Sequence, residues 1–507
     1  MEPVEQPFSS RRNVTQSLEL CIAQARASQM QWSRQTLEHR LYAIGRFRRS
    51  LAASPSRFIN ALSHLPARTN VQSIAAEIIP LANAARFLLR RAERILRPRV
   101  RTPLFSGIRI TVDHRPHGVV LIVGPSNYPL FLPGVQVLQA LVAGNAVLLK
   151  PGKDGTPAAM ALISLLRTSG MDPTLIHLLP EDVEVVHDAI KLGVDQVVLT
   201  GSVEAGKAII KSMAVKPPRP AILELSGSDA VFILSSADLY RAVALLQFGL
   251  EFNGSATCIA PRRVIIIRSM LEKFEHLLLR RFEDYKFSAI SDAAAEKAMP
   301  LVSDALRRGA RVVVGKISAD KIFGPLILMD ASPDMPIMSA DIMAPILCVH
   351  VVADMLEAIG SYNACPFRLS AAIFGDPVPA RTLARRLDAG CIVINDLIAP
   401  TAHPEVPFTA RGESGNGTTR GPEGLLAMTW PNAVVERTGR TLPHLRKPEQ
   451  HDQQILLLVL RLLHGADMAV RLRALAALMR IFMGFGGSLN APADGSINAR
   501  DHRHDSL

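Results

Sequence analysis

Short apolar runs alternate with helix-like stretches between residues 118 and 200, and this alternation limits the folds that the chain can adopt. The apolar runs occupy residues 118–125, 146–151, 176–179 and 196–200, and the helix-like stretches include residues 132–141 and 156–168. Strands that are apolar on both sides are typical of parallel sheets covered by helices, and the alternation indicates βαβ units. The sequence therefore predicts a parallel sheet with helices on both of its faces.

Two further blocks flank this region. Residues 18–96 repeat apolar side chains at intervals of three and four, which is typical of helices, and residues 108–112 alternate like a strand. A second block of strands and helices runs from about residue 230 to residue 395, with strand-like runs at residues 264–267 and 391–395. We therefore expect a second α/β domain after the first.

The chain of 507 residues has room for two or three domains. Its composition of 48% hydrophobic and 20% charged residues is that of a globular protein and not of a disordered one. Its five cysteines include no CxxC pair and no regular spacing, which argues against a disulfide framework and against a metal site. Residues 1–17 predict a flexible lead that lacks the apolar core of a secretory signal, so we expect a cytoplasmic protein.

The net charge of +12 raises the question of nucleic-acid binding. Part of the excess lies in Arg86, Arg90, Arg94 and Arg97, whose spacing places them along one side of a helix. A solvated helix face explains such a pattern, and the sequence adds neither interleaved aromatic residues nor a nucleic-acid-binding signature. We expect no nucleic-acid partner.

The C-terminal residues 445–507 contain a mostly apolar stretch at 455–485 that charged residues interrupt. No run reaches the roughly 20 apolar residues that a transmembrane helix needs. Gly465 is expected to separate two short helices. Three interpretations stay open for them: docking on the body or on a partner subunit, peripheral contact with a membrane, or a weakly ordered tail.

Three segments carry side chains with complementary chemistry. The thiol of Cys258 lies in FNGSATCIAPRR, the carboxylate of Glu224 in AILELSG, and the amide of Asn127 in PSNYP. A thiolate attacks carbonyl carbons, a carboxylate activates water, and an amide N–H stabilises an oxyanion. Together the segments resemble the aldehyde dehydrogenase superfamily, of which the chain is identified as a somewhat divergent member from about residue 18 to 440.

The resemblance implies NAD(P)-dependent oxidation of a small-molecule aldehyde to its carboxylic acid. In this scheme Cys258 is the nucleophile and forms a thiohemiacetal, while its backbone N–H and the Asn127 amide stabilise the alkoxide. Hydride transfer to a nicotinamide then leaves a thioester, and Glu224 is the base for the water that releases the acid. A relative that makes or reduces acyl thioesters, and a catalytically impaired scaffold of the same fold, stay as alternatives.

The resemblance also assigns residues to the cofactor. Lys150 ends a strand of the sheet, where open α/β sheets bind ligands. Gly201 and Ser202 lie in a strand-to-helix segment that matches the family's pyrophosphate segment. Asp341 occupies the place of a glutamate that holds the nicotinamide ribose. Lys153 stands where many NAD-using relatives carry a glutamate on the adenosine ribose, so we hypothesise that the chain accepts NADP.

Several positions depart from the family pattern. Ser255 and Ala256 replace a Gly-Gln pair, Ser226 and Ser228 replace a Gly and a Lys, Thr409 and Ala410 replace two glycines, and Arg368 replaces another. Glycine permits close approach and positive φ, so we expect these replacements to alter the backbone or the shape of the cleft.

The predicted fold class is α/β, with a Rossmann-like coenzyme domain, an α/β catalytic domain and a small β oligomerisation element. By the resemblance, the coenzyme domain comprises residues 18–97 and 117–226, and the catalytic domain residues 227–421. The oligomerisation element comprises residues 98–116 and 431–444, which implies a homodimer or homotetramer. Residues 445–507 form a C-terminal helical extension.

Overall fold

The computed structural model describes residues 11–66, 68–102, 107–214, 219–318, 321–440, 442–449 and 451–483. The chain divides into two compact units, and the larger comprises the residues up to Arg101 and Ile110–Val434. The smaller unit comprises Thr102–Arg109 and Val435–Leu507.

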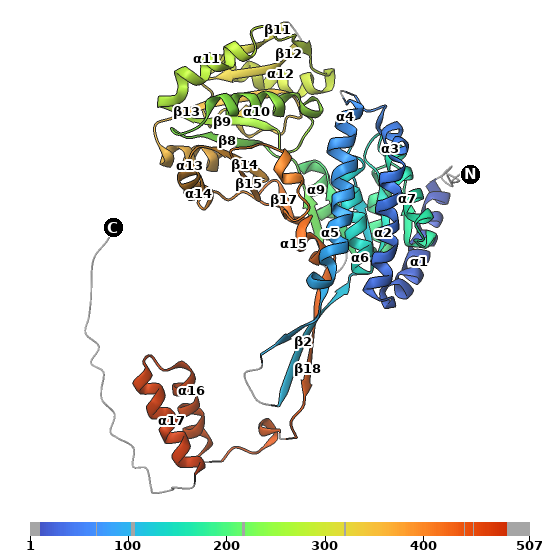
Figure 1. Cartoon of the computed structure of the whole chain (residues 1–507), viewed down its shortest axis with the longest axis vertical. Helices are drawn as coiled ribbons and strands as arrows, with labels where there is room; N and C mark the ends of the chain where they lie inside the picture. Colours follow the sequence, from blue (N-terminus) through green and yellow to red (C-terminus); the bar gives the residue numbers. More distant parts are fainter. Residues whose placement is uncertain are drawn as a thin grey trace. The chain divides into compact units, whose positions relative to one another are not determined.

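Helices open the larger unit, as the apolar periodicity of residues 18–96 predicts (Figure 1). They are α1 (Arg11–Arg34), α2 (Leu37–Ala53), α3 (Pro55–Leu62), α4 (Asn70–Ser73), the π-helical turn Ile74–Ile78, and α5 (Ile79–Leu96). Helix α1 begins at Arg11, inside the segment expected to be a flexible lead, while residues 1–10 lie outside the described residues. Arg86, Arg90, Arg94 and Arg97 are exposed, as a solvated face requires.

The first sheet follows the predicted alternation of strands and helices. In sheet order its strands are β16 (Phe408–Ala410), β17 (Gly415–Thr419), β7 (Ala221–Glu224), β6 (Gln196–Thr200), β3 (Val119–Val123), β4 (Ala146–Lys150) and β5 (Ile176–Leu178). The five strands from β7 to β5 are parallel, and β17 pairs antiparallel with β7. A segment that the sequence assigned to the catalytic domain, residues 408–419, therefore completes this sheet.

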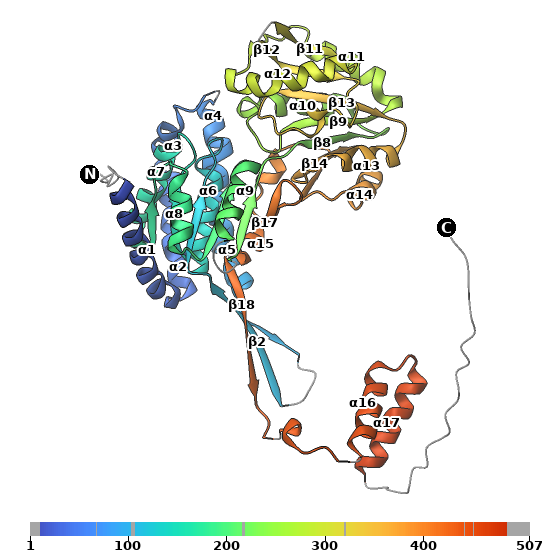
Figure 2. The same ribbon diagram turned by 180° about the vertical axis from the view of Figure 1, so that it is seen from behind.

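Helices cover both faces of the first sheet (Figures 1 and 2). One layer holds α6 (Phe131–Ala143) and α7 (Thr156–Thr168), backed by α2 and α5, and the other holds α1, α8 (Glu184–Leu192) and α9 (Val203–Met213). Strands β3, β4 and β6 are buried along their whole length, which explains their unbroken apolar sequences. Because parallel strands end at one edge, residues that follow β3, β4, β6 and β7 gather there.

The second sheet confirms the predicted second α/β block. In order its strands are β10 (Ser288–Ala289), β12 (Lys321–Met329), β13 (Ile346–Val352), β9 (Pro261–Ile267), β8 (Asp229–Ile233), β14 (Ser370–Phe374) and β15 (Cys391–Ile394), and β11 (Arg311–Ser318) pairs with β12. Its helices are α10 (Leu239–Glu251), α11 (Leu271–Arg281), α12 (Asp292–Arg307), α13 (Met355–Ala364) and α14 (Pro377–Ala384). The strands from β12 to β15 are parallel.

A third, three-stranded sheet has the order β1 (Arg99–Arg101), β2 (Ile108–Pro116) and β18 (Thr429–Arg437). These strands coincide with the segments expected to form the oligomerisation element, and helix α15 (Gly421–Leu426) precedes β18. Burial in the monomer is low along β18, where most residues are exposed. The assembly role of this sheet stays a prediction.

The smaller unit contains a helical hairpin. Helix α16 (Asp452–His464) ends before Gly465, and α17 (Met468–Phe482) begins after Asp467, whose side chain accepts a hydrogen bond from Val470 N at 2.8 Å. The two short helices predicted on either side of Gly465 are therefore confirmed. Within the described ranges, no helix is both long enough and apolar enough to cross a membrane.

Candidate active site

The candidate nucleophile lies in a tight loop between α10 and β9. Asn253, Gly254 and Ser255 all have positive φ, at 53°, 60° and 61°, and Cys258 follows three residues later. Burial, together with the carboxylates of Glu224 and Asp229, raises the pKa of the Cys258 thiol, and the Arg420 guanidinium opposes that rise. The resting thiol is therefore protonated and needs a base or a substrate to become reactive.

Asn127 lies in the loop after β3, and two hydrogen bonds tie this loop to the nucleophile loop. Asn127 Nδ2 donates to the carbonyl of Ala256 at 2.8 Å, and the hydroxyls of Tyr128 and Thr257 are 2.7 Å apart. The amide of Asn127 is thus held at the carbonyl of Ala256, two residues before Cys258 in the chain. Its second N–H does not bond to that carbonyl. A side-chain amide in the same cavity as the nucleophile is the type of group that stabilises an oxyanion.

A buried ion pair between Arg68 and Glu77 contacts the same loops, and it was not predicted from the sequence. Arg68 pairs with Glu77, donates to Asn253 Oδ1 at 2.9 Å, and also donates to the Asn127 carbonyl. Glu77 in turn accepts from the backbone N–H of Phe131 at 2.6 Å and of Leu130 at 3.1 Å. The only sequence signal of this ion pair is an acidic residue, Glu77, inside an apolar helical stretch. The loop residues that the pair contacts lie far away along the chain.

Glu224 ends β7 and points into the same region from the first sheet. Its side chain is buried, with 3% of the residue exposed, and its Oε2 accepts from the Thr419 hydroxyl at 2.7 Å. Burial raises the pKa of the Glu224 carboxyl, whereas Arg420 and the Thr419 hydrogen bond act in the opposite direction. A carboxyl tuned in this way can accept a proton from water near neutral pH.

One open cavity connects these groups with part of the expected cofactor set. Asn127, Glu224 and Cys258 line it, and so do Gly201, Ser202 and Asp341. Lys150 and Lys153 are not among its lining residues. Lys150 is buried at the end of β4, and its burial lowers the pKa of the ammonium; Lys153 is exposed in the following turn.

The cavity walls fit the phosphates of a dinucleotide. Ser202 caps α9 by accepting from Ala205 N at 3.2 Å, which leaves the other N–H groups of the first turn free of this cap. A second helix, α12, begins at the cavity with Ser291 as its cap, and Lys297 adds an ammonium group. Two helix N-termini and the Lys297 ammonium are the groups here that could hold a pyrophosphate, in a cavity that the carboxylates of Glu224 and Asp341 also line. The contribution of α12 could not be read from the sequence, because it depends on how the two sheets meet.

Two departures from the family pattern find partners in the structure. Ser226, in place of a glycine, donates its hydroxyl to Asp341, and this bond opposes the rise that burial causes in the pKa of that carboxyl. Ser255 has a φ of 61°, in the left-handed region that favours glycine. Its hydroxyl accepts from the buried guanidinium of Arg262 at 2.7 Å, which compensates for the strained backbone.

Comparison with known proteins agrees with this geometry. The model of the Aldehyde dehydrogenase family matches residues 8–434. The chain is 28% identical over 451 residues to the 4,4'-diapolycopene aldehyde oxidase of a Methylomonas species, covering 86% of this chain and 83% of the relative. It is 29% identical over 440 residues to a Mycobacterium tuberculosis protein named putative succinate-semialdehyde dehydrogenase (NADP(+)) 2, covering 82% of this chain and 84% of the relative.

Among solved structures, the NAD-dependent aldehyde dehydrogenase of Sinorhizobium meliloti superposes with a TM-score of 0.78 at 24% identity. The match covers 85% of this chain and 89% of that structure. At this identity the superposition establishes the fold, which is the α/β architecture expected from the sequence.

Proposed function

The chain belongs to the aldehyde dehydrogenase family and is an NAD(P)-dependent oxidoreductase that converts an aldehyde to a carboxylic acid; we propose that it does so through a thioester on Cys258. The observation that carries this proposal is the convergence of Cys258, Asn127 and Glu224 on one cavity. These three side chains come from the nucleophile loop, the loop after β3 and the end of β7.

In the first half of the reaction, the Cys258 sulfur bonds to the aldehyde carbon, and the thiol passes its proton to solvent. The carbonyl oxygen becomes an alkoxide, which the free N–H of Asn127 and the backbone N–H of Cys258 stabilise. When bound, the nicotinamide of the cofactor would accept the hydride that the thiohemiacetal loses as it becomes a thioester.

In the second half, Glu224 removes a proton from a water molecule as its oxygen attacks the thioester carbon. The carbon–sulfur bond then breaks, the acid leaves, and the Cys258 thiolate takes the proton that Glu224 removed from the water. The raised pKa of Glu224 suits it to this role, because its carboxylate is a stronger base than an exposed one.

For the cofactor we propose a site at the edge where β3, β4, β6 and β7 end. Gly201 and Ser202 would receive the pyrophosphate at the start of α9, and Asp341 would accept from the nicotinamide ribose. Lys150 and Lys153 would face the adenosine ribose, and the ammonium of Lys153 would attract a 2′-phosphate.

A panel of aldehydes, assayed with NAD and with NADP, tests the proposal. We expect acid formation by the native chain and none by Cys258→Ala, which should still bind the cofactor. Equal inactivity of the two proteins, with neither cofactor bound, would refute it in favour of a scaffold role. Release of product as an acyl-CoA when CoA is supplied would assign the thioester to transfer instead of hydrolysis.

We also propose that the chain forms a homodimer or homotetramer through the sheet of β1, β2 and β18. Trp430, Val434 and Val435 on β18 are exposed apolar residues along one strand, and such a strand is suited to pairing with a copy of itself. Light scattering should give a mass that is a multiple of 55.1 kDa, and Val434→Lys should reduce it to the monomer.

For the hairpin of α16 and α17 we propose peripheral contact with an anionic membrane surface of the cytoplasm. Both helices keep large apolar side chains exposed, including Leu456, Leu460, Leu472 and Phe482. Basic residues accompany them: Arg461, Arg471, Arg473 and Arg480. An apolar stripe with basic neighbours is typical of interfacial helices. The native chain should float with anionic vesicles, and the double substitution Leu456→Glu with Leu460→Glu should abolish flotation. If the native chain does not bind anionic vesicles, docking of the hairpin on protein is favoured instead.

A further inference from the structure

Arg262 is a buried cation that joins two loops of the candidate active site. It lies in β9, with 6% of the residue exposed. Its guanidinium donates to the hydroxyl of Ser255 at 2.7 Å and to the carbonyl of the same residue at 2.6 Å. It also donates to the carbonyl of Ala344. A guanidinium presents its N–H groups in a fixed fork, so Arg262 fixes these two backbone segments relative to each other.

The two segments carry groups that the proposed reaction uses. Ser255 lies three residues before Cys258 in the nucleophile loop, and Ala344 lies three residues after Asp341. Cys258 and Asp341 line the same open cavity, whereas Arg262 is not among the residues that line it. Arg262 therefore stands behind the wall of the cavity and can affect a bound molecule only through the residues that it holds.

The charge of Arg262 acts on the same groups. It interacts electrostatically with Asp229, Asp341 and Cys258. Burial raises the pKa of the Asp341 carboxyl, while the hydrogen bond from Ser226 and the charge of Arg262 oppose that rise. An ionised carboxylate accepts hydrogen bonds at both of its oxygens, so these two neighbours keep Asp341 suited to accept from hydroxyl groups.

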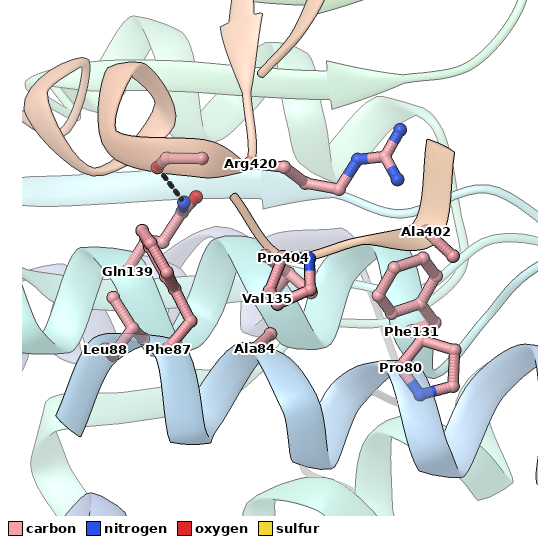
Figure 3. Close-up of a pocket in the computed structure, with 11 residues that line it drawn as sticks. Pro80, Ala84, Phe87, Leu88, Phe131, Val135, Gln139, Ala402, Pro404 and Arg420 are labelled. Carbon is pink, nitrogen blue, oxygen red and sulfur yellow. Dashed lines mark hydrogen bonds between the residues drawn. The ribbon is translucent and has the colours of Figure 1, made fainter. Parts of the chain in front are cut away.

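A second buried arginine near the nucleophile, Arg420, has different surroundings (Figure 3). Its guanidinium lies 4.3 Å from the centroid of the Phe408 ring and lines a separate, mainly apolar cavity. Neither Cys258 nor Asp341 lines that cavity. Arg262 is thus the buried cation that connects the nucleophile loop to the segment of Asp341.

We propose that Arg262 is a positioning residue for the nicotinamide cofactor, which holds Asp341 in place beside Cys258 to receive the nicotinamide ribose. This rests on the proposed function, because Asp341 receives a ribose only if a nicotinamide dinucleotide binds in the cavity. Arg262 acts in two ways. Its bonds to Ser255 and Ala344 place the segment, and its charge favours the ionised carboxylate. Loss of Arg262 weakens cofactor binding although Arg262 does not touch the cofactor.

The first experiment measures cofactor binding by titration calorimetry, with NAD and with NADP and without any aldehyde. In Arg262→Met the dissociation constant of the tighter-bound cofactor should rise at least about tenfold. Arg262→Lys, which keeps the charge and loses the planar fork, should recover part of the loss. Asp229 keeps Arg263 as a second cation, so neither variant leaves this buried carboxylate without one.

Two control variants separate positioning from general effects. Arg268→Met removes an exposed arginine just after β9 and should bind the cofactor like the native chain. Phe274→Leu trims a fully buried side chain of α11, and it should lower the unfolding temperature without changing the dissociation constant. A rise of the dissociation constant in Phe274→Leu equal to that in Arg262→Met would overturn the proposal, because any loss of stability would then have the same effect.

A double-mutant cycle tests whether Arg262 acts through Asp341. Asp341→Asn should itself weaken binding, and adding Arg262→Met to it should raise the dissociation constant by less than about twofold more. Losses that multiply in the double variant would overturn the proposal. Should Arg262→Met not fold, the cycle is made with Arg262→Lys, whose smaller loss must also vanish in the Asp341→Asn background.

The proposal and the proposed function fail in different ways. Cofactor binding that follows the cycle, without oxidation of any aldehyde, would keep the role of Arg262 and refute the reaction. Oxidation of aldehydes with native cofactor affinity in Arg262→Met would keep the reaction and refute the role of Arg262.

Discussion

The hydroxyl of Thr419 donates a hydrogen bond to Glu224 Oε2 at 2.7 Å, across the antiparallel pair of β17 and β7. Both residues are buried, so the bond acts where water does not weaken it. It favours the ionised form of the carboxyl and so opposes the rise that burial causes in the pKa of Glu224. A residue 195 positions away in the chain thereby prepares the base for its role.

Removing this bond should move the pH profile of the enzyme. In Thr419→Val the pKa of Glu224 rises further, so the carboxylate that activates water is present only at higher pH. The acidic limb of kcat against pH should shift upwards, with a loss of about tenfold in kcat at pH 7. The neighbouring Thr418→Val, which loses only its bond to Thr409, should keep the native profile. A limb that stays in place would assign the base to another group.

Replacing Glu224 should change the reactivity of the Cys258 thiol and the turnover of the enzyme in opposite directions. The Glu224 charge helps to raise the pKa of the Cys258 thiol, so Glu224→Gln lowers that pKa and increases the thiolate fraction. We expect Glu224→Gln to react faster with iodoacetamide at pH 8 while its kcat falls by about 10²-fold or more. Glu413→Gln, an exposed carboxylate, is the control. Slower alkylation would show that Glu224 activates the resting thiol instead.

The sequence predicts β3, β4, β5 and β6 of the first sheet, because their apolar runs are largely buried and the residues after them turn, but it does not predict β7, β16 or β17. Asn127 and Glu224 converge because β3 and β7 end at one edge of a parallel sheet, and the resemblance to a family, not a predicted strand, assigned Glu224 to the site. Cys258 reaches this edge from the second sheet, and there the resemblance to a family was needed.

What could not be predicted depends on pairs formed by tertiary structure. Arg68 and Glu77 are only nine positions apart, but the sequence does not indicate that they contact the loops of Asn127 and Cys258. Arg420 resembles any surface arginine until the packing of Phe408 and Phe131 buries it. Sequence periodicity reports which face of a helix or strand is buried, and it does not report which polar residues meet inside.

Ser255 should show how the strained nucleophile loop is stabilised. Its positive φ costs roughly 1 kcal/mol relative to glycine, while its bond to the buried Arg262 is worth about 1.5–3 kcal/mol. Ser255→Ala loses the bond and keeps the strain, whereas Ser255→Gly loses the bond and relieves the strain. The free energy of unfolding should therefore fall in both, and by about 1 kcal/mol less in Ser255→Gly. Urea denaturation measures the free energy of unfolding of each variant. A larger loss in Ser255→Gly than in Ser255→Ala would mean that the backbone at Ser255 is not strained.

Lys153 should set the choice between the two nicotinamide cofactors. It is exposed in the turn after β4, and Glu181 holds this turn by accepting from Asp154 N at 2.9 Å and from Thr156 N at 3.0 Å. An ammonium there attracts the 2′-phosphate of NADP, whereas a carboxylate repels it and accepts from the ribose hydroxyls of NAD. In Lys153→Glu the ratio of kcat/KM for NADP to that for NAD should fall at least about tenfold.

Lys211→Glu makes the same charge change on an exposed part of α9 and should leave the ratio unaltered. Because both variants lower the net charge equally, a general electrostatic effect would move the two ratios together. A strong preference for NAD that persists in Lys153→Glu would instead place this side chain in solvent, away from the adenosine ribose.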